Sequence, residues 1–232
     1  MDVPFRSSAD LRQNICNATE DLGQYGTQKL PSGSTVYVVG NDSLYRLVKG
    51  VGDAYDDIAG LVINPNDGSN NRWFRETENG GDPWSAQVVL ASSLVVTPAA
   101  QSTWIALGST PGSFGLASGN NEAWSLNLAT GSLSFRGPTR LVQVSYQVTL
   151  IGAAAIDVEA ALNVSGDVPS GSTDAVPNFG NQGASVSTTV RACLSGQRQA
   201  LVGKNDNVRL MLRNMTGIQN ITALYAAYSV TL

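Results

Sequence analysis

The amino-acid sequence predicts an all-β protein, in which a small α+β module precedes a C-terminal sandwich of the jelly-roll kind. The first observation is composition: only 14% of the 232 residues are charged, against about 25% in typical domains, and 24 are glycine. The second is spacing, because from residue 84 onward alternating apolar runs are separated by turn residues roughly every 6–14 positions. About eight to ten such strands indicate a sandwich or jelly roll.

Residues 1–80 are the predicted N-terminal module, and they begin with the one convincing helix candidate, residues 8–22. Leu11, Ile15 and Leu22 recur at helical spacing, and Ser8 can cap the first turn. Short strands are expected after the helix. The segments 35–39 and 43–48 flank an Asn-Asp turn, which predicts a hairpin.

The segment Gly80-Gly-Asp-Pro83 is the predicted domain boundary, because it combines glycine freedom with a proline that ends a strand ladder. The second domain is expected over residues 84–232. Its longest strand is predicted at Arg140–Gly152, with Val142, Val144, Tyr146 and Val148 on one face.

The end of the chain predicts three closing strands: Ala184–Leu194, Asn207–Leu212 and Ile221–Leu232. The last one is apolar to its final residue, and such a strand usually needs partners on both sides. Tyr225 and Tyr228 are three apart on it, so their side chains are expected on opposite faces.

Charge and hydropathy weigh against several function classes. The net charge of −4 leaves no basic patch for nucleic acid or an anionic membrane, and no run of about 18 apolar residues suggests a membrane span. The N-terminal residues do not resemble a secretory signal. Cys16 and Cys193 are expected as free thiols of a reducing cytoplasm, although a disulfide between them stays open.

Catalytic and metal-binding patterns are weak, and no enzyme activity, metal or cofactor is expected. The chain has no histidine. Asp53, Asp56 and Asp57 could ligate calcium, but their spacing favours a solvated acidic loop. Asp157 and Glu159 lie on the same face of a predicted strand and could form a carboxylate pair for acid/base catalysis. The interpretation as exposed polar residues of the strand is favoured. Cys193 lacks an evident base.

The segment Glu122-Ala-Trp-Ser-Leu-Asn-Leu-Ala-Thr-Gly-Ser-Leu-Ser-Phe-Arg-Gly-Pro138, followed by the strand 142–150, resembles the tumour-necrosis-factor-like and complement-globular-head-like jelly rolls. The resemblance covers residues 86–232 and implies a homotrimer with aromatic residues of the inner sheet near its axis. The residues it assigns to the trimer interface are Trp104, Tyr146, Tyr225 and Tyr228. The same four residues, together with Trp84 and Trp124, could instead line a carbohydrate groove.

The N-terminal pattern Ser34-Thr-Val-Tyr-Val-Val39, Ser43-Leu-Tyr-Arg-Leu47, Leu61-Val-Ile-Asn-Pro65 and Asn71-Arg-Trp-Phe-Arg75 resembles a module of bacteriophage fibre, spike and capsid-decorating proteins. The resemblance implies that this module attaches the chain to a capsid. The expected capsid-contact residues are Phe5, Leu11, Ile15, Tyr37, Tyr45 and Trp73.

The two resemblances together predict a structural protein of a tailed-phage virion. The first hypothesis is a homotrimeric capsid cement or decoration protein on the outer surface of the capsid, assembled in the bacterial cytoplasm and bound to the major capsid protein. The alternative is a short tail fibre or spike whose jelly roll binds a host-surface glycan. No fibre shaft is evident in the sequence, which favours the first. A carbohydrate-active enzyme is the third and weakest hypothesis.

Overall fold

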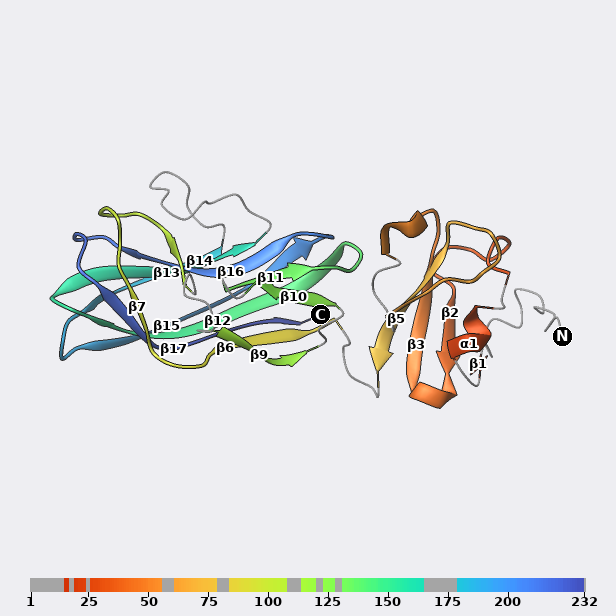
Figure 1. The fold of residues 1–232 in the computed structure, drawn as a ribbon, viewed down its shortest axis with the longest axis horizontal. Helices are drawn as coiled ribbons and strands as arrows, with labels where there is room; N and C mark the ends of the chain where they lie inside the picture. The colour runs from red at the N-terminus through yellow and green to blue at the C-terminus, as the bar shows by residue number, and fades with distance from the viewer. Residues whose placement is uncertain are drawn as a thin grey trace. The chain divides into compact units, whose positions relative to one another are not determined.

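The computed structural model describes residues 15–16, 19–23, 26–55, 61–78, 84–107, 114–119, 123–127, 131–164 and 179–231. It divides the chain into two compact units, Met1–Trp84 and Ser85–Leu232 (Figure 1). The predicted boundary at residues 80–83 lies outside the described residues. Trp84 belongs to the first unit, where its ring lies 6.3 Å from the ring of Phe74.

The N-terminal unit contains a five-stranded sheet with the strand order β1-β2-β3-β5-β4. Its strands are β1 (Ile15–Cys16), β2 (Thr35–Val38), β3 (Ser43–Val48), β4 (Val62–Ile63) and β5 (Arg72–Glu78). The predicted hairpin is confirmed, because β2 and β3 are antiparallel neighbours. Asp42 turns the chain between them with a left-handed φ of 46°. Two 3₁₀ turns, Val39–Asn41 and Gly52–Tyr55, complete the connections.

The predicted helix over residues 8–22 is wrong at Ile15 and Cys16 and is confirmed only over its last four residues. Only α1 (Thr19–Leu22) is helical, whereas Ile15 and Cys16 form β1 and pair in parallel with Tyr37 and Val38 of β2. Residues 8–14 lie outside the described residues. The β-branched Ile15 suits a strand, and pairing with β2 outweighs the helical spacing of the apolar residues.

An apolar core packs on one face of the sheet in this unit. It consists of Cys16, Leu22, Leu30, Val36, Val38, Tyr45, Leu47 and Trp73, with Ile63 packed against it. Beside the core, Asp67 connects the loop that contains Thr27 with its own loop through hydrogen bonds. Its carboxylate accepts hydrogen bonds from the Thr27 hydroxyl at 2.7 Å and from the Ser69 backbone N–H at 2.9 Å.

The C-terminal unit is a sandwich of two antiparallel sheets. Sheet I has the order β15-β12-β17-β6-β9, with β7 also paired to β17; sheet II has the order β10-β11-β16-β13-β14, with β8 also paired to β16. The strands of sheet I are β6 (Ala86–Leu90), β7 (Leu94–Val96), β9 (Phe114–Gly119), β12 (Arg140–Gly152), β15 (Arg191–Val202) and β17 (Ile221–Thr231). Those of sheet II are β8 (Ile105–Ala106), β10 (Trp124–Asn127), β11 (Ser132–Phe135), β13 (Ile156–Val164), β14 (Phe179–Val186) and β16 (Asn207–Asn214).

The connections make this sandwich a jelly roll, as predicted. From β12 to β17 the chain passes through sheets I, II, II, I, II and I, so that β12 pairs with β17 and β13 pairs with β16. The closing strand β17 has neighbours on both sides, β12 and β6, which confirms the prediction for it.

The predicted strand Ala184–Leu194 is wrong, because a turn divides it into the end of β14 and the start of β15. The Ser187 backbone N–H donates to the Val190 carbonyl at 3.0 Å, and the Ser187 hydroxyl accepts from the Val190 N–H at 3.1 Å. A serine hydroxyl that accepts a hydrogen bond from a backbone N–H a few residues later stabilises a turn instead of a continuous strand, even where the neighbouring residues are β-branched.

Candidate functional site

The face of sheet I that points away from the sandwich core is uncharged over most of its area. The ladder pairs place its side chains in rows across β15, β12 and β17, with β6 extending two of the rows. In order along β12, the rows are Leu201–Leu141, Gln199–Gln143–Thr231, Gln197–Ser145–Ser229–Gln87, Ser195–Gln147–Ala227–Val89 and Cys193–Thr149–Tyr225, and the next row, Arg191–Ile151–Thr222, carries a charged arginine. Amides, hydroxyls, a thiol and apolar groups make up the first five rows, which we call the uncharged face.

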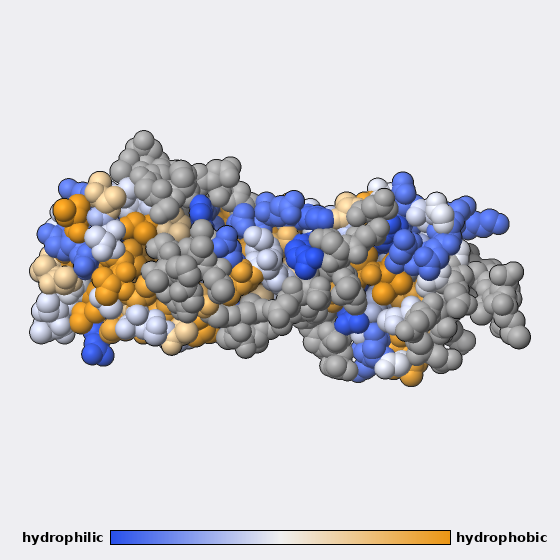
Figure 2. Space-filling model, in the orientation of Figure 1, coloured by the Kyte–Doolittle hydropathy of each residue, from blue (hydrophilic) through white to orange (hydrophobic). Residues whose placement is uncertain are grey.

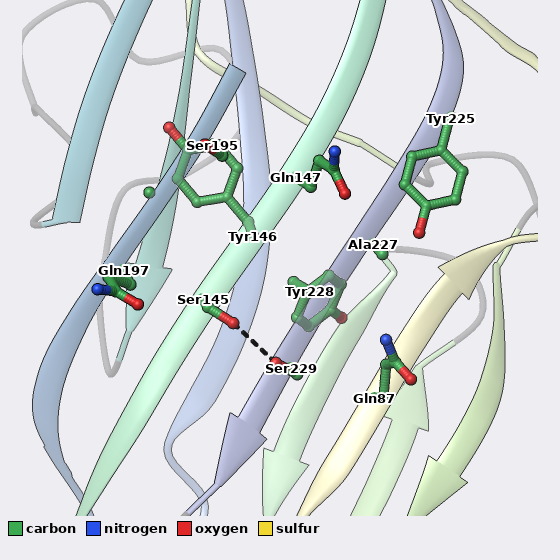
Figure 3. A pocket seen from close by; sticks show the side chains of 11 residues that line it. Gln87, Ser145, Tyr146, Gln147, Ser195, Gln197, Tyr225, Ala227, Tyr228 and Ser229 are labelled. Atoms are coloured by element: carbon green, nitrogen blue, oxygen red, sulfur yellow. Dashed lines mark hydrogen bonds between the residues drawn. The ribbon is translucent and has the colours of Figure 1, made fainter. Parts of the chain in front are cut away.

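A hollow of about 570 Å³ occupies the middle of the uncharged face. Small residues form its floor, and the Ser145 and Ser229 hydroxyls are hydrogen-bonded across it at 2.8 Å (Figure 3). Longer side chains rise around the floor. They are Gln87, Gln147, Gln197 and Tyr225.

Hydrogen bonds hold two of the amides on this face. The Gln143 amide donates to the Gln197 amide oxygen at 3.2 Å, and the Gln147 amide donates to the Cys193 sulfur at 3.4 Å. Neither cysteine is part of a disulfide; Cys193 is exposed, whereas Cys16, in the other unit, is buried.

A β-bulge in β17 brings Tyr225 onto the uncharged face. The ladder pairs Thr149 with Tyr225 but Leu150 with Ala223, so Leu224 is an extra residue without a partner on β12. Leu224 and Tyr225 are consequently both exposed, by 36% and 40% of their surface. Without the bulge, the alternation that buries Ala223 would also turn Tyr225 toward the core.

Of the four residues predicted for the trimer interface, only Tyr225 lies on an exposed surface. Trp104, Tyr146 and Tyr228 are buried within the chain and offer little surface to another subunit, and their place at a trimer interface stays a prediction. The Tyr146 hydroxyl donates to the Ala160 carbonyl of sheet II at 3.0 Å. Burial raises the pKa of Tyr146 to about 12 and raises that of Tyr228 further.

Trp104 has a different position, on the side of sheet II that points away from sheet I. It forms a small cluster there with Ala106, Ala161 and Met211. The Arg213 guanidinium lies 4.4 Å from the centre of the Trp104 ring and is ion-paired with Glu159 at 2.7 Å.

The predicted capsid-contact residues differ in how exposed they are. Tyr37 is 38% exposed, and its hydroxyl donates to Asp42. Tyr45 and Trp73 are fully buried in the core of the N-terminal unit and offer no surface there, and their contact with a capsid stays a prediction. Ile15 lies in β1, whereas Phe5 and Leu11 lie outside the described residues.

The candidate carboxylates of the sequence have structural contacts. Asp157 accepts a hydrogen bond from the Ser185 hydroxyl at 2.5 Å, and Glu159 pairs with Arg213. Asp53 lies in a 3₁₀ turn, while Asp56 and Asp57 lie outside the described residues. Within the described residues, no three Cys, Asp or Glu side chains gather as a metal site would require. The helical part of those residues is too short to cross a bilayer.

Sequence reasoning did not single out the glutamines and serines of the uncharged face. The signal was present in β12, where Gln143, Ser145 and Gln147 alternate with the buried Val142, Val144 and Tyr146. A solvent-facing strand normally carries charges at some of these positions, and here none is charged.

Comparison with known proteins gives structural similarity without sequence similarity. No protein-family model and no curated protein sequence matches the chain. Solved structures that are similar to 64% of this chain include Eiger TNF from S. frugiperda (12% identity, 91% of that chain, TM-score 0.44), murine APRIL (9%, 99%, 0.42) and the globular domain of zebrafish complement 1qA protein (13%, 95%, 0.40). At these scores, the jelly-roll assignment rests on the strand order itself.

Proposed function

We propose that the chain is a non-enzymatic structural protein of a tailed-phage virion: a homotrimeric capsid cement or decoration protein. In this proposal the C-terminal jelly rolls associate through the uncharged face of sheet I, and the N-terminal unit binds the major capsid protein on the outer surface of the head. The observation that carries the proposal is the uncharged face with Tyr225 exposed on it.

The chemistry of this face supports association between copies. The buried centres of protein interfaces are depleted in charged residues, as this face is, and they often contain an exposed aromatic such as Tyr225. Identical copies that meet through a charged patch would repel one another, and an uncharged patch avoids that cost. Leu141 and Leu201, which are 56% and 64% exposed, extend the face with apolar surface that solvent contact disfavours.

The N-terminal unit supports the capsid-binding part of the proposal through its residue pattern and its independence. It has a core of its own, and Tyr37 and Val39 remain exposed beside the β2–β3 turn. A trimer would present three such units. Three linked weak contacts give a much stronger attachment than one contact does.

Copy number on purified virions tests the function directly. A decoration protein is expected at many copies per particle, in multiples of three, and heads lacking it should break at lower temperature or lower salt. Residues 1–84 should be required for incorporation, and residues 85–232 should form a soluble trimer without them. Few copies per particle would contradict the decoration role.

The second candidate is a short tail fibre or spike that binds a host-surface glycan, and the hollow favours it specifically. Amides, hydroxyls and an exposed tyrosine ring around an uncharged cavity suit a neutral sugar. A trimer formed through this face would cover the hollow. Glycan binding by a trimer whose hollow is occupied would therefore require another site, and loss of host adsorption without the protein would favour the fibre.

A further inference from the structure

We infer that the hollow binds an uncharged pyranose sugar, with one face of the sugar ring on Tyr225 and the sugar hydroxyls on the surrounding amides. The inference rests on the second candidate function and deepens it, because it names the class of sugar, the groups that hold it and its effect on assembly. Sugar binding and association of the jelly rolls use the same face of sheet I, so each excludes the other.

The polar groups of the hollow are neutral. Its lining includes three amides and three hydroxyls, those of Gln87, Gln147, Gln197, Ser145, Ser195 and Ser229, and every described residue that lines it is uncharged. An amide both donates and accepts hydrogen bonds, as a hydroxyl does, so these groups match the hydroxyls of a sugar. A carboxylated or phosphorylated sugar would lose hydration here without meeting a cation, which disfavours it.

The hydrogen bonds between lining residues leave polar atoms for a ligand. The Gln197 amide oxygen accepts from the Gln143 amide at 3.2 Å. The Gln147 amide nitrogen donates to the Cys193 sulfur at 3.4 Å. Among the described residues, the Gln197 amide nitrogen and the Gln147 amide oxygen have no partner. They offer a donor and an acceptor at different sides of the floor (Figure 3).

Tyr225 supplies the aromatic part of the site. It lines the hollow beside Ala227, two residues later on β17, and is 40% exposed. The bulge at Leu224 holds it on this face, and its hydroxyl is directed toward Ala227 (Figure 3). One face of a pyranose ring carries mainly C–H groups, which pack on an aromatic ring, and the tyrosine hydroxyl remains for a polar contact.

The size of the hollow suits a small ligand. Its volume of about 570 Å³ lies within the range of about 300–1,000 Å³ that is typical of small-molecule sites. The contacts are neutral hydrogen bonds and one aromatic ring, so a single pyranose should bind with a Kd of about 1 mM.

Association of copies through the uncharged face would cover the hollow, so a bound sugar opposes it. A ligand that binds only the free face weakens association by a factor of 1 + [L]/Kd for each copy. At a sugar concentration of about ten times Kd this factor is about 11 per copy, so the association constant of a trimer should fall about 10³-fold.

Sugar binding by a monomeric form of the whole chain tests the site. Leu141→Arg places a charge on the face proposed for association, although Leu141 does not line the hollow. Leu201→Arg, opposite Leu141 in the ladder, is a second variant of this kind. In a ligand-observed NMR titration, at least one of the methyl glycosides of glucose, galactose and mannose should bind with a Kd of about 1 mM. Glucuronate should bind at least about tenfold more weakly.

Two further substitutions in the same monomeric background locate the binding. Tyr225→Ala should weaken it about tenfold or more, because the ring is lost. Gln199→Ala is the matched control, since it removes an exposed amide of the same face that does not line the hollow, and it should leave the Kd unchanged.

Sedimentation velocity of the wild-type chain separates this inference from the proposed trimer and needs no variant. A glycoside that binds should lower the association constant of a wild-type trimer, and glucuronate at the same concentration should not. A wild-type monomer that binds the glycoside would contradict the trimer and support the site. A folded monomer that binds none of the glycosides at up to about 50 mM, or binds them equally after Tyr225→Ala, would overturn the inference alone. Binding to a trimer that does not dissociate would also overturn it.

Discussion

Tyr228→Phe tests how the two sheets are joined, because the Tyr228 hydroxyl bridges them. It donates to the Gly131 carbonyl, directly before β11. Gly131 holds a φ of 60°, a left-handed conformation that favours glycine, and this turns its carbonyl into the sandwich. Phenylalanine keeps the ring and removes only the bridge.

The magnitude follows from the burial of this hydrogen bond. Tyr228 is 1% exposed, so water does not replace the lost hydroxyl. A buried group left without a partner costs about 1–3 kcal/mol, and the Gly131 carbonyl is the group affected, so we expect a loss of about 1–3 kcal/mol. A unit of this length loses about 2–4 °C in Tm per kcal/mol, which predicts a decrease of roughly 2–12 °C.

Thermal and denaturant unfolding of the whole chain, followed by circular dichroism and tryptophan fluorescence, measures this loss. Tyr225→Phe is the matched control on the same strand, because that hydroxyl has no described partner within the chain. Unfolding of the control, compared at a protein concentration where both variants have the same oligomeric state, should change by less than about 0.5 kcal/mol. Equal stability of Tyr228→Phe and the control would refute the bridge between the sheets.

Three other predictions follow from side chains outside the uncharged face. Burial by itself would raise the pKa of Asp67, but hydrogen bonds from Ser69 and Thr27 lower this pKa to about 2. The ionised carboxylate therefore stabilises the N-terminal unit above about pH 4, and this stabilisation is lost as the pH falls to about 2. In Asp67→Asn, the unfolding free energy should decrease less between about pH 4 and 2 than it does in the wild-type chain. For Tyr146, stability depends on pH in the opposite direction, because burial raises the pKa of this tyrosine to about 12. The stability that the neutral hydroxyl contributes is present below about pH 10 and is lost as the pH rises toward 12. Tyr146→Phe should make this loss of unfolding free energy at alkaline pH smaller. Arg213→Leu removes the cation over a buried tryptophan and the partner of a glutamate, and should lower the unfolding free energy by about 1–2 kcal/mol in urea titrations.

The regular parts of the fold could be predicted because their sequence signals are local. Alternation along β12 shows which residues are buried, and turn residues between alternating runs indicate a sandwich. The apolar end of the chain correctly predicts a central strand. Tyr225 and Tyr228 do point to opposite faces, as their spacing indicates.

The rest could not be predicted because it depends on pairing between distant strands. Ile15 has the spacing of a helical residue, but it pairs with Tyr37, about twenty positions later in the chain, and therefore forms part of a sheet. The bulge at Leu224 follows from the register against β12, which no local pattern in β17 reports. Burial of Trp104 and Tyr146 likewise depends on segments that the sequence alone does not place beside them.

Sedimentation velocity of the wild-type chain and of Tyr225→Asp tests the central claim most directly. The wild-type chain should sediment as a trimer, with three times the 24.3 kDa mass of one chain. Tyr225→Asp places a charge on the uncharged face, and it should sediment as a folded monomer with an unchanged circular dichroism spectrum. A wild-type monomer, or a Tyr225→Asp variant that remains a stable trimer, would contradict assembly through this face.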